Sequence, residues 1–261
     1  MTISMPYVCL ACGEDLENFS PICPSCASAE TVTRSQAAEE ASEKSSRNRA
    51  QIASKISATL PDTISTGRKA WDIALGGGFV KPSSVLIYGP KGVGKSTSAL
   101  RIGIHVAKLT NRKALYGSAE MPKEHLRMML DKMGISESDL KYLYINDSGH
   151  FEDMLEDVLA LKPIVTIWDS IQRFKVEDEI GEIELRKVVI GAIELSNSVK
   201  GIGLLLSQVN KDDDFLGPNG IGHDTDIALS LRKVGPNLIA VECLEKNRFA
   251  PTPLTATESL Y

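Results

Sequence analysis

The sequence predicts an α/β fold, in which a mostly parallel β-sheet is covered by helices on both faces and a small four-cysteine module precedes it. Three observations lead to this prediction. A glycine-rich loop at residues 89–96 stands between an apolar strand and a helical segment. Continuous apolar strands then alternate with helical segments as far as residue 210. Near the N-terminus, four cysteines are arranged as two Cys-x-x-Cys pairs.

The composition is that of a globular protein with one sizeable core and room for a small second module. The chain has 261 residues, of which 43% are hydrophobic and 24% are charged. No stretch approaches the ~20 apolar residues of a membrane-spanning helix, and the N-terminus lacks a secretory signal pattern. We therefore expect a cytoplasmic location. The net charge of -5 argues against nucleic-acid binding by overall positive charge, but leaves a local basic loop open.

The first module is defined by four of the five cysteines. We expect residues 1–30 to fold around a metal held by Cys9, Cys12, Cys23 and Cys26. A Cys-x-x-Cys turn delivers two ligands, so two such turns supply the tetrahedral set of a structural Zn²⁺ site. Two disulfides or a redox-active pair are the alternatives, but a reducing compartment and the symmetric pairing favour zinc. Cys243 stands in an apolar strand and is expected to be an inert core thiol.

Residues 31–59 are expected to form a linker or a solvated helix. The segment is rich in Ala, Ser, Glu and basic residues and has no aromatic residue, so it can bury little surface. The main folded body is expected at residues 60–261.

The phosphate-binding loop is the most specific motif of this body. Val85–Tyr88 has the pattern of a buried strand, Gly89–Ser96 matches G-x-x-x-x-G-K-[ST], and a helical segment follows. Backbone N–H groups of such a loop surround a phosphate, Lys95 reaches the β- and γ-phosphates, and Ser96 ligates Mg²⁺. We therefore predict ATP and Mg²⁺ as cofactors. The residues predicted to hold them are Gly89, Pro90, Lys91, Gly92, Val93, Gly94, Lys95, Ser96 and Thr97, together with Asp169.

Downstream of this loop the pattern alternates. We expect strands at residues 113–120, 141–147, 163–170 and 201–210, and helices at residues 122–134, 151–162 and 184–200. Two further strands are expected at residues 226–233 and 237–246. The turn between them is too short for a helix, so we expect both to be antiparallel strands at one edge of the sheet.

Polar residues at strand ends are the candidates for catalysis, because ligands bind beyond the carboxyl ends of parallel strands. Asp169 is placed to hold Mg²⁺, usually through water. Glu120 is placed to polarise the attacking water as a general base, and Gln208 is placed to sense the γ-phosphate. For Glu120 and Gln208 the alternative is an ordinary polar strand end that faces solvent.

These motifs together resemble the bacterial RadA (Sms) family of recombination ATPases, in the RecA superfamily. The stretch STGRKAWDIALGGGFVKPSSVLIYGPKGVGKST is similar to the opening of a RecA-like core, and a four-cysteine module precedes it as in RadA. YGSAE resembles the family's YVSGEE and places its catalytic glutamate at Glu120; IWDSIQ is similar to its IDSIQ. KNRFA at residues 246–250 is similar to its KNRFG signature, and GPNGIGHDTDIALSL to a further family segment that matches His223 and Asp226.

The resemblance implies a RecA-like P-loop ATPase core with a zinc ribbon. It implies a DNA-dependent ATPase or helicase that acts in homologous recombination on single-stranded DNA, as a homo-oligomeric ring or filament. An ATP-gated single-strand binding, annealing or loading protein and a DnaB-like replicative helicase are the alternatives. The family's Lon-protease-like C-terminal domain has no counterpart after residue 250, so we interpret the chain as a short form of the kind that a phage encodes.

Two loops are expected to contact DNA by this resemblance. The first offers Arg173, Phe174 and Lys175, a basic-aromatic-basic triplet suited to phosphates and bases, with a solvated loop as the alternative. The second offers Lys211 and Phe215, but it also carries three consecutive aspartates that repel a DNA backbone, which argues against contact through it.

The KNRFA segment is expected to complete a neighbouring subunit's site. Phosphoryl transfer develops charge that one subunit's loop does not fully cover, and a cation from the next subunit, an arginine finger, stabilises it. The resemblance assigns this role to Lys246 and Arg248, with Phe249 packed to fix the hairpin. An ordinary solvated strand end is the alternative.

Overall fold

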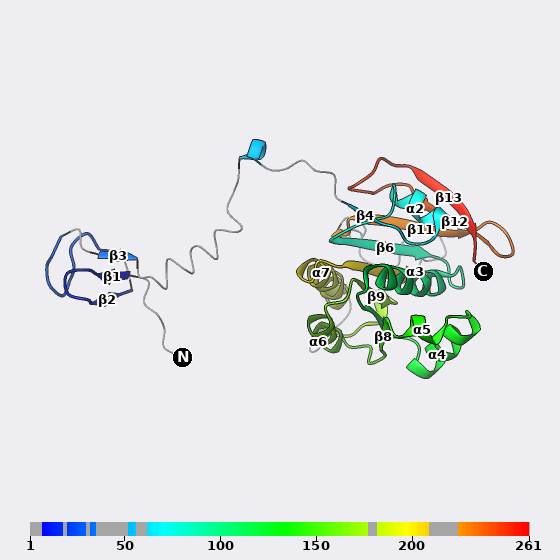
Figure 1. The fold of residues 1–261 in the computed structure, drawn as a ribbon, viewed down its shortest axis with the longest axis horizontal. Helices are drawn as coiled ribbons and strands as arrows, with labels where there is room; N and C mark the ends of the chain where they lie inside the picture. Colours follow the sequence, from blue (N-terminus) through cyan, green and yellow to red (C-terminus); the bar gives the residue numbers. More distant parts are fainter. Residues whose placement is uncertain are drawn as a thin grey trace. The chain divides into compact units, whose positions relative to one another are not determined.

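The computed structural model describes residues 7–17, 20–29, 32–34, 52–55, 62–176, 182–208 and 224–260. The chain divides into two compact units, Met1–Leu60 and Pro61–Tyr261, which are drawn in Figure 1. Each unit has its own buried core. Among the described residues, none of the helices has both the length and the apolar character that crossing a bilayer demands.

The first unit contains an antiparallel sheet in the order β2-β1-β3. Its strands are β1 (Tyr7–Cys9), β2 (Asp15–Leu16) and β3 (Val32–Arg34). Because β3 pairs with β1, the sheet extends past residue 30, where the sequence placed the end of this module. Of the predicted linker at 31–59, only β3 and residues 52–55, with the 3-10 helix η2 (Ala53–Lys55), fall within the described residues.

The second unit is built on a large sheet whose described strands follow the order β13-β12-β11-β6-β10-β9-β7-β8. They are β6 (Ser83–Gly89), β7 (Ala114–Ser118), β8 (Leu143–Asn146), β9 (Val165–Asp169), β10 (Ile202–Gln208), β11 (Ile227–Lys233), β12 (Leu238–Cys243) and β13 (Leu254–Ser259). From β11 to β8 every neighbouring pair is parallel, whereas β12 and β13 pair antiparallel. The predicted α/β fold with a mostly parallel sheet is confirmed.

The edge of this sheet differs from the prediction. β11 is parallel to β6 and lies inside the sheet, so the expectation of an antiparallel edge strand at 226–233 is wrong. The connection from β10 to β11 is long enough for a crossover, which parallel pairing requires, and only the turn from β11 to β12 is short. The edge strand is β13, which the sequence analysis did not predict, because its burial alternates residue by residue and it lacks a continuous apolar run.

Helices cover both faces of the sheet (Figure 1). They are α2 (Lys69–Leu75), α3 (Lys95–Thr110), α4 (Lys123–Lys132), α5 (Glu137–Leu140), α6 (Phe151–Leu161) and α7 (Glu182–Ser198). One core cluster joins α2, α3 and α4 to the sheet, and a second joins α6 and α7 to its other face. In β10, Leu204 and Leu206 belong to the first cluster and Leu205 to the second, as the alternation of side chains along a strand requires.

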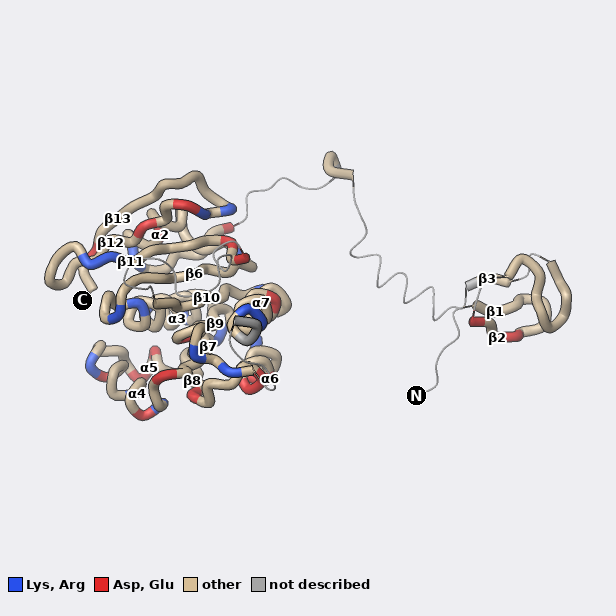
Figure 2. The backbone as a smooth tube through the Cα atoms, turned by 180° about the vertical axis from the view of Figure 1, so that it is seen from behind, with Lys and Arg blue, Asp and Glu red and all other residues tan. Residues whose placement is uncertain are grey.

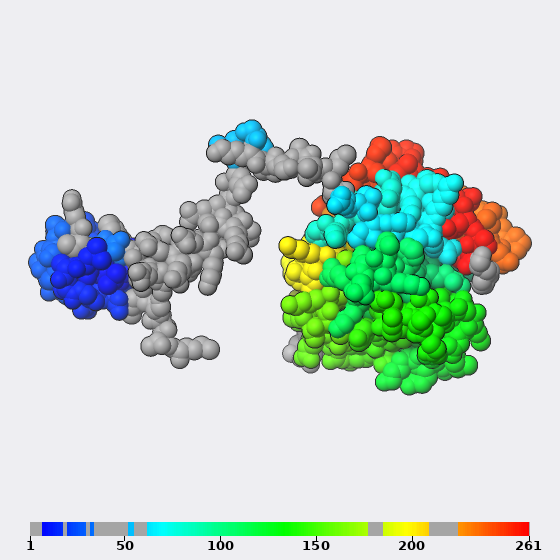
Figure 3. Space-filling view, viewed as in Figure 1, coloured from blue at the N-terminus to red at the C-terminus, as the bar shows by residue number. Residues whose placement is uncertain are grey.

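A smaller sheet of β4 (Thr63–Ile64) and β5 (Phe79–Val80) stands before the phosphate-binding loop, with α2 between its strands in sequence. Strand β13 lies beside α2, and Figure 3 shows the two in contact at the surface. The Glu258 carboxylate of β13 accepts hydrogen bonds from Trp71 Nε1 at 2.8 Å and from Arg68 Nε at 2.6 Å. These contacts fix the last strand to the start of the unit.

Candidate active site

The phosphate-binding loop connects β6 to α3 and depends on glycine. Gly94 is the N-cap of α3 and has φ +103°, a backbone conformation that disfavours other residues. A Cβ at this position would lie 2.4 Å from Leu260 Cδ2, so the loop packs closely against Leu260, the residue that follows β13, and a side chain here would have to displace it. The predicted helix follows the glycines of the loop and begins at Lys95, so the last two residues of the 89–96 motif belong to its first turn.

Lys95 points back over the loop. Its Nζ donates hydrogen bonds to the carbonyl oxygens of Gly89 at 2.7 Å and Pro90 at 3.1 Å. Burial lowers the pKa of Lys95, while the nearby Asp169 and Glu120 raise it. The Lys95 ammonium is thus held inside the loop by two backbone carbonyl oxygens. These take the place of phosphate oxygens as its hydrogen-bond acceptors.

Asp169, at the end of β9, lies beside the start of α3. Its Oδ2 accepts hydrogen bonds from Ser96 Oγ and from the hydroxyl of Tyr116. Burial raises the pKa of Asp169, whereas these two hydrogen bonds lower it. Ser96 and Asp169 thus bring a hydroxyl and a carboxylate oxygen together, a donor pair suited to Mg²⁺. Tyr116 was not predicted as a site residue, because nothing in an apolar strand pattern reveals which tyrosine hydroxyl meets a carboxylate.

Glu120 follows β7 and is the centre of a second hydrogen-bonded group. Its Oε1 accepts hydrogen bonds from Ser170 Oγ at 2.7 Å and from Gln208 Nε2 at 3.3 Å. The guanidinium of Arg173 forms an ion pair with the same oxygen, at a distance of 3.2 Å from Nε. The ends of three neighbouring strands thus converge on one carboxylate, and Glu120 and Gln208 do not merely face solvent.

A cavity of about 310 Å³ brings these groups together. It is lined by Lys91, Gly92, Gly94, Lys95, Ser96, Thr97, Glu120, Met121, Met129, Asp169, Ser170, Gln208 and Leu260. Two lysines and two carboxylates belong to its polar wall, and two methionines with Leu260 add an apolar one. The residues present therefore fit a nucleotide with a divalent cation at the loop.

The segment after β9 separates into buried and exposed residues. Phe174 is only 3% exposed, and its ring packs edge-on against Trp168 at 5.1 Å between centroids. This corrects the prediction that Phe174 stacks on DNA bases, because the ring is part of the core. Arg173 and Lys175 on either side are exposed. Lys211 and Phe215, predicted for the second DNA loop, lie outside the described residues, as does His223.

Lys246 and Arg248 follow β12, in the connection to β13, rather than lying on edge strands. Arg248 Nη1 forms an ion pair with Asp226 Oδ1 at 3.0 Å, and the Arg248 side chain is 55% exposed. Burial lowers the pKa of Lys246, and the neighbouring Arg248 adds to this effect. Of the described residues, neither of these two cations is among those that line the cavity of their own chain.

Asn247 holds this segment in place, a role that the sequence analysis did not assign. Its Nδ2 donates to the carbonyl of Leu75 at the end of α2 at 3.1 Å, and its Oδ1 accepts from the backbone N–H groups of Phe249 and Ala250. Phe249 is 40% exposed and lies outside the core, so its role in fixing the hairpin stays a prediction. A side-chain amide that bonds its own following backbone is a common turn device, and the asparagine of KNRFA was the available signal.

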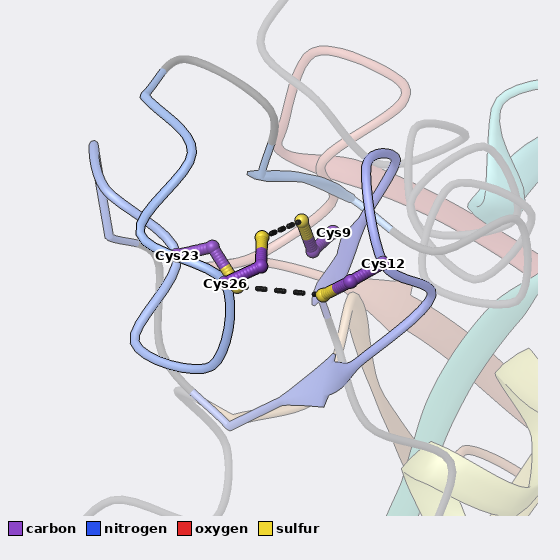
Figure 4. Close-up of side chains that lie close together, drawn as sticks. All are labelled: Cys9, Cys12, Cys23 and Cys26. Carbon is purple, nitrogen blue, oxygen red and sulfur yellow. Dashed lines mark hydrogen bonds between the residues drawn. The ribbon is translucent and has the colours of Figure 1, made fainter.

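The cysteine cluster of the first unit has the geometry of a tetrahedral metal site. Figure 4 shows the sulfur atoms of Cys9, Cys12, Cys23 and Cys26 pointing toward one another. The Sγ atoms lie 3.8 Å apart for Cys9 and Cys26, 3.7 Å apart for Cys12 and Cys23, and all lie within 4.8 Å of one another. Tetrahedral Zn²⁺ with Zn–S distances of ~2.3 Å gives an edge of about 3.8 Å, so the four thiols fit this ion.

Two similar turns deliver these cysteines. Gly13 N–H donates to the Cys9 carbonyl at 2.8 Å, and Ala27 N–H donates to the Cys23 carbonyl at 2.9 Å. Gly13 and Ala27 both have positive φ, of 77° and 59°. The second turn therefore keeps the shape of the first although alanine stands where glycine is favoured.

A strand, a phosphate-binding loop and a helix, with an acidic residue at the end of a nearby parallel strand, define a P-loop protein with a RecA-like core. The sequence model of the family described as AAA domain matches residues 54–214, more than half of the chain, and the chain belongs to this family.

Among curated relatives, the DNA repair protein RadA of Aquifex aeolicus is 28% identical over 259 residues, which cover 94% of this chain and 55% of that protein. The DNA repair protein RadA of Campylobacter jejuni is 27% identical, covering 94% of this chain and 56% of that protein. The chain thus spans about half the length of these relatives. The crystal structure of the RadB recombinase is similar with a TM-score of 0.57 and 25% identity, over 74% of this chain and 94% of that one. The resemblance to RadA is confirmed: the chain is a RadA/RadB-like protein of the RecA superfamily.

Proposed function

We propose that the chain is a DNA-dependent ATPase of the RadA type that acts on single-stranded DNA in recombination, as an oligomer with nucleotide at its subunit interfaces. The observation that carries this proposal is the convergence of Lys95, Asp169 and Glu120 on one cavity. Similarity to proteins named DNA repair protein RadA and RadB recombinase supports the recombination role.

The chemistry assigned to the cavity is phosphoryl transfer to water. Mg²⁺, when bound, neutralises charge on the phosphates, and Ser96 and Asp169 would hold it. When nucleotide binds, Lys95 Nζ exchanges the loop carbonyl oxygens for phosphate oxygens, because carbonyl and phosphate oxygens are both hydrogen-bond acceptors. Glu120 orients the water and accepts its proton, and Gln208, already bonded to Glu120, is placed to report the state of the γ-phosphate.

DNA contact is proposed for the exposed cations Arg173 and Lys175 rather than for a broad basic surface. Figure 2 shows Lys and Arg interspersed with Asp and Glu along the second unit, in keeping with the net charge of -5. A local contact of a few phosphates gives binding that weakens with salt in proportion to their number.

The interface role is proposed for Lys246 and Arg248. Both belong to a segment that Asn247 fixes to the end of α2, which supports a defined position for the two cations. Arg248 must leave Asp226 to reach a neighbouring phosphate; its own side chain is 55% exposed, and the less exposed Asp226 carboxylate keeps its hydrogen bonds from Ser84.

The first unit is proposed to bind one Zn²⁺ through its four cysteines, as a structural site. All four ligands come from the chain, which leaves no open position for catalysis.

ATP hydrolysis by the Lys95→Ala variant tests the nucleotide assignment. We expect nucleotide binding and phosphate release, with or without single-stranded DNA, to fall to background. Lys108→Ala is the matched control, because Lys108 lies on the same helix, is 57% exposed and pairs with Asp139 away from the cavity. Normal hydrolysis by Lys95→Ala would refute the assignment. Strand-displacement and strand-annealing assays with and without hydrolysable ATP then separate a helicase from an annealing protein.

A further inference from the structure

One oxygen of the Glu120 carboxylate accepts two hydrogen bonds and also takes part in an ion pair. Ser170 Oγ, Arg173 Nε and Gln208 Nε2 all lie within 3.3 Å of Oε1. A carboxylate oxygen has two lone pairs, so this oxygen is already fully engaged. A water that is to give its proton to this oxygen must first displace one of these three groups.

Two of these residues, Arg173 and Gln208, lie where the two segments predicted to contact DNA begin. Arg173 is the last residue of η3 (Ile171–Arg173), which follows β9. Gln208 is the last residue of β10 and directly precedes residue 209, where the described residues stop. The general base is therefore bonded to both segments through side chains that the structure describes.

Of the three groups on this oxygen, the Arg173 side chain is the one that can leave without disturbing the core. The next residue, Phe174, is anchored against Trp168, and the backbone of Lys175 exchanges hydrogen bonds with Gly149 at 3.0 Å and Phe151 at 2.9 Å. The Arg173 side chain itself is 63% exposed, so it can turn from Glu120 to solvent while the backbone stays fixed.

We infer that Arg173 restrains Glu120 when no DNA is bound, and that a DNA phosphate releases the carboxylate by taking Arg173 as its own partner. The guanidinium binds one anion or the other, because its exposed ion pair with Glu120 is weak enough for a phosphate to compete. Hydrolysis then becomes dependent on DNA without a large conformational change. Arg173 acts through Glu120 and is a positioning residue. This inference rests on the proposed function and adds its regulation.

The test compares ATP hydrolysis by wild-type protein and Arg173→Ala, each with and without oligo(dT). We expect the DNA-free rate of Arg173→Ala to rise about three- to fivefold and its stimulation by DNA to shrink by the same factor. A fivefold change corresponds to about 1 kcal/mol. Arg232→Ala is the matched control, since Arg232 is 62% exposed and pairs with Glu242 at 2.9 Å outside the cavity. Its DNA-free rate should stay at the wild-type value.

Two further measurements separate a restraint from a structural role. Raising the salt concentration screens an exposed ion pair, so it should increase the DNA-free rate of wild-type protein and leave that of Arg173→Ala unchanged. Arg173→Lys keeps the charge and should restore part of the restraint. Thermal melting establishes that each variant is folded, and Arg173→Lys carries the test if Arg173→Ala does not fold.

A DNA-free rate that stays equal or falls in folded Arg173→Ala overturns the inference. Binding of labelled oligo(dT) by wild-type protein, followed by fluorescence anisotropy, tests the proposed function separately. Wild-type protein that binds oligo(dT) without any rise in rate overturns the release step alone. Wild-type protein that binds no DNA overturns the proposed function, whatever the rate of the variant.

Discussion

Replacing Arg248 by alanine tests whether two subunits share one nucleotide site. Arg248 pairs with Asp226 at 3.0 Å and is 55% exposed, and the 16% exposed Asp226 carboxylate keeps its hydrogen bonds from Ser84 when Arg248 is removed. We therefore expect Arg248→Ala to remain folded. Nucleotide binding should be retained, because other residues line the cavity of the same chain. Turnover should fall by about 10³-fold or more, the contribution typical of an arginine finger.

Mixing two inactive variants makes this test direct. Glu120→Gln should bind nucleotide and fail to hydrolyse it, since it lacks the general base. In a random 1:1 assembly with Arg248→Ala, an interface is active when one side has Glu120 and its neighbour has Arg248. The probability is one half times one half, so about a quarter of the interfaces should recover. Phosphate release after mixing measures this fraction, and a pull-down with two different tags confirms mixed assembly.

Arg232→Ala is the control for removing an exposed, paired arginine, and its turnover should match that of wild-type protein. Cooperative hydrolysis around a ring would lower the recovered fraction below a quarter. Zero recovery in confirmed mixed assemblies would refute the shared site and place the action of Arg248 within its own subunit, beside Asp226.

Three other changes have defined outcomes. Cys9→Ser should release Zn²⁺ and unfold the first unit without changing nucleotide binding; zinc analysis and a binding titration measure both, and zinc-free native protein would contradict the site. Because burial raises the pKa of Asp169, folding loses stability as pH rises above 3.8 through this raised value. Asp169→Asn should therefore increase the melting temperature at pH 7 relative to wild-type protein, and this gain should vanish near pH 3. An equal gain at both pH values would show that the buried charge of Asp169 is not its cause. Gly94→Ala should lose nucleotide binding and about 1–2 kcal/mol or more of stability, whereas Gly134→Ala, with φ +70° and no atom within 4 Å of the added Cβ, should lose only the backbone part.

Local patterns sufficed for the parts of the site that one stretch of sequence builds. The phosphate-binding loop, its flanking strand and helix, and the two cysteine turns each depend on residues close together in the chain. The strand ends at Glu120, Asp169 and Gln208 could also be predicted, because parallel strands end at the same edge of a sheet. The continuous apolar runs predicted β6, β9 and β10 as parallel strands, because strands that are buried on both faces of a sheet are apolar throughout.

Features that depend on distant contacts could not be predicted. The direction of β11 depends on the crossover that precedes it. In β13 partly buried and exposed residues alternate, so its sequence is hard to distinguish from that of an exposed loop. Phe174 has the sequence context of a DNA-contacting aromatic, but Trp168 and the absence of a side chain at Gly117 give it a buried position. The hydrogen bond from Tyr116 to Asp169 joins two strands whose register no single segment reveals.

The packing of β13 has a consequence for how this protein is made. The indole of Trp71 and the guanidinium of Arg68 find their carboxylate partner at Glu258, and Gly94 packs against Leu260. During synthesis, α2 and the phosphate-binding loop leave the ribosome long before residues 254–260 do. Contacts of such large sequence separation form late and slow folding. A nascent chain paused before residue 254 should therefore have its loop sequence but an unfinished nucleotide pocket, with Trp71 still open to the solvent or to a chaperone.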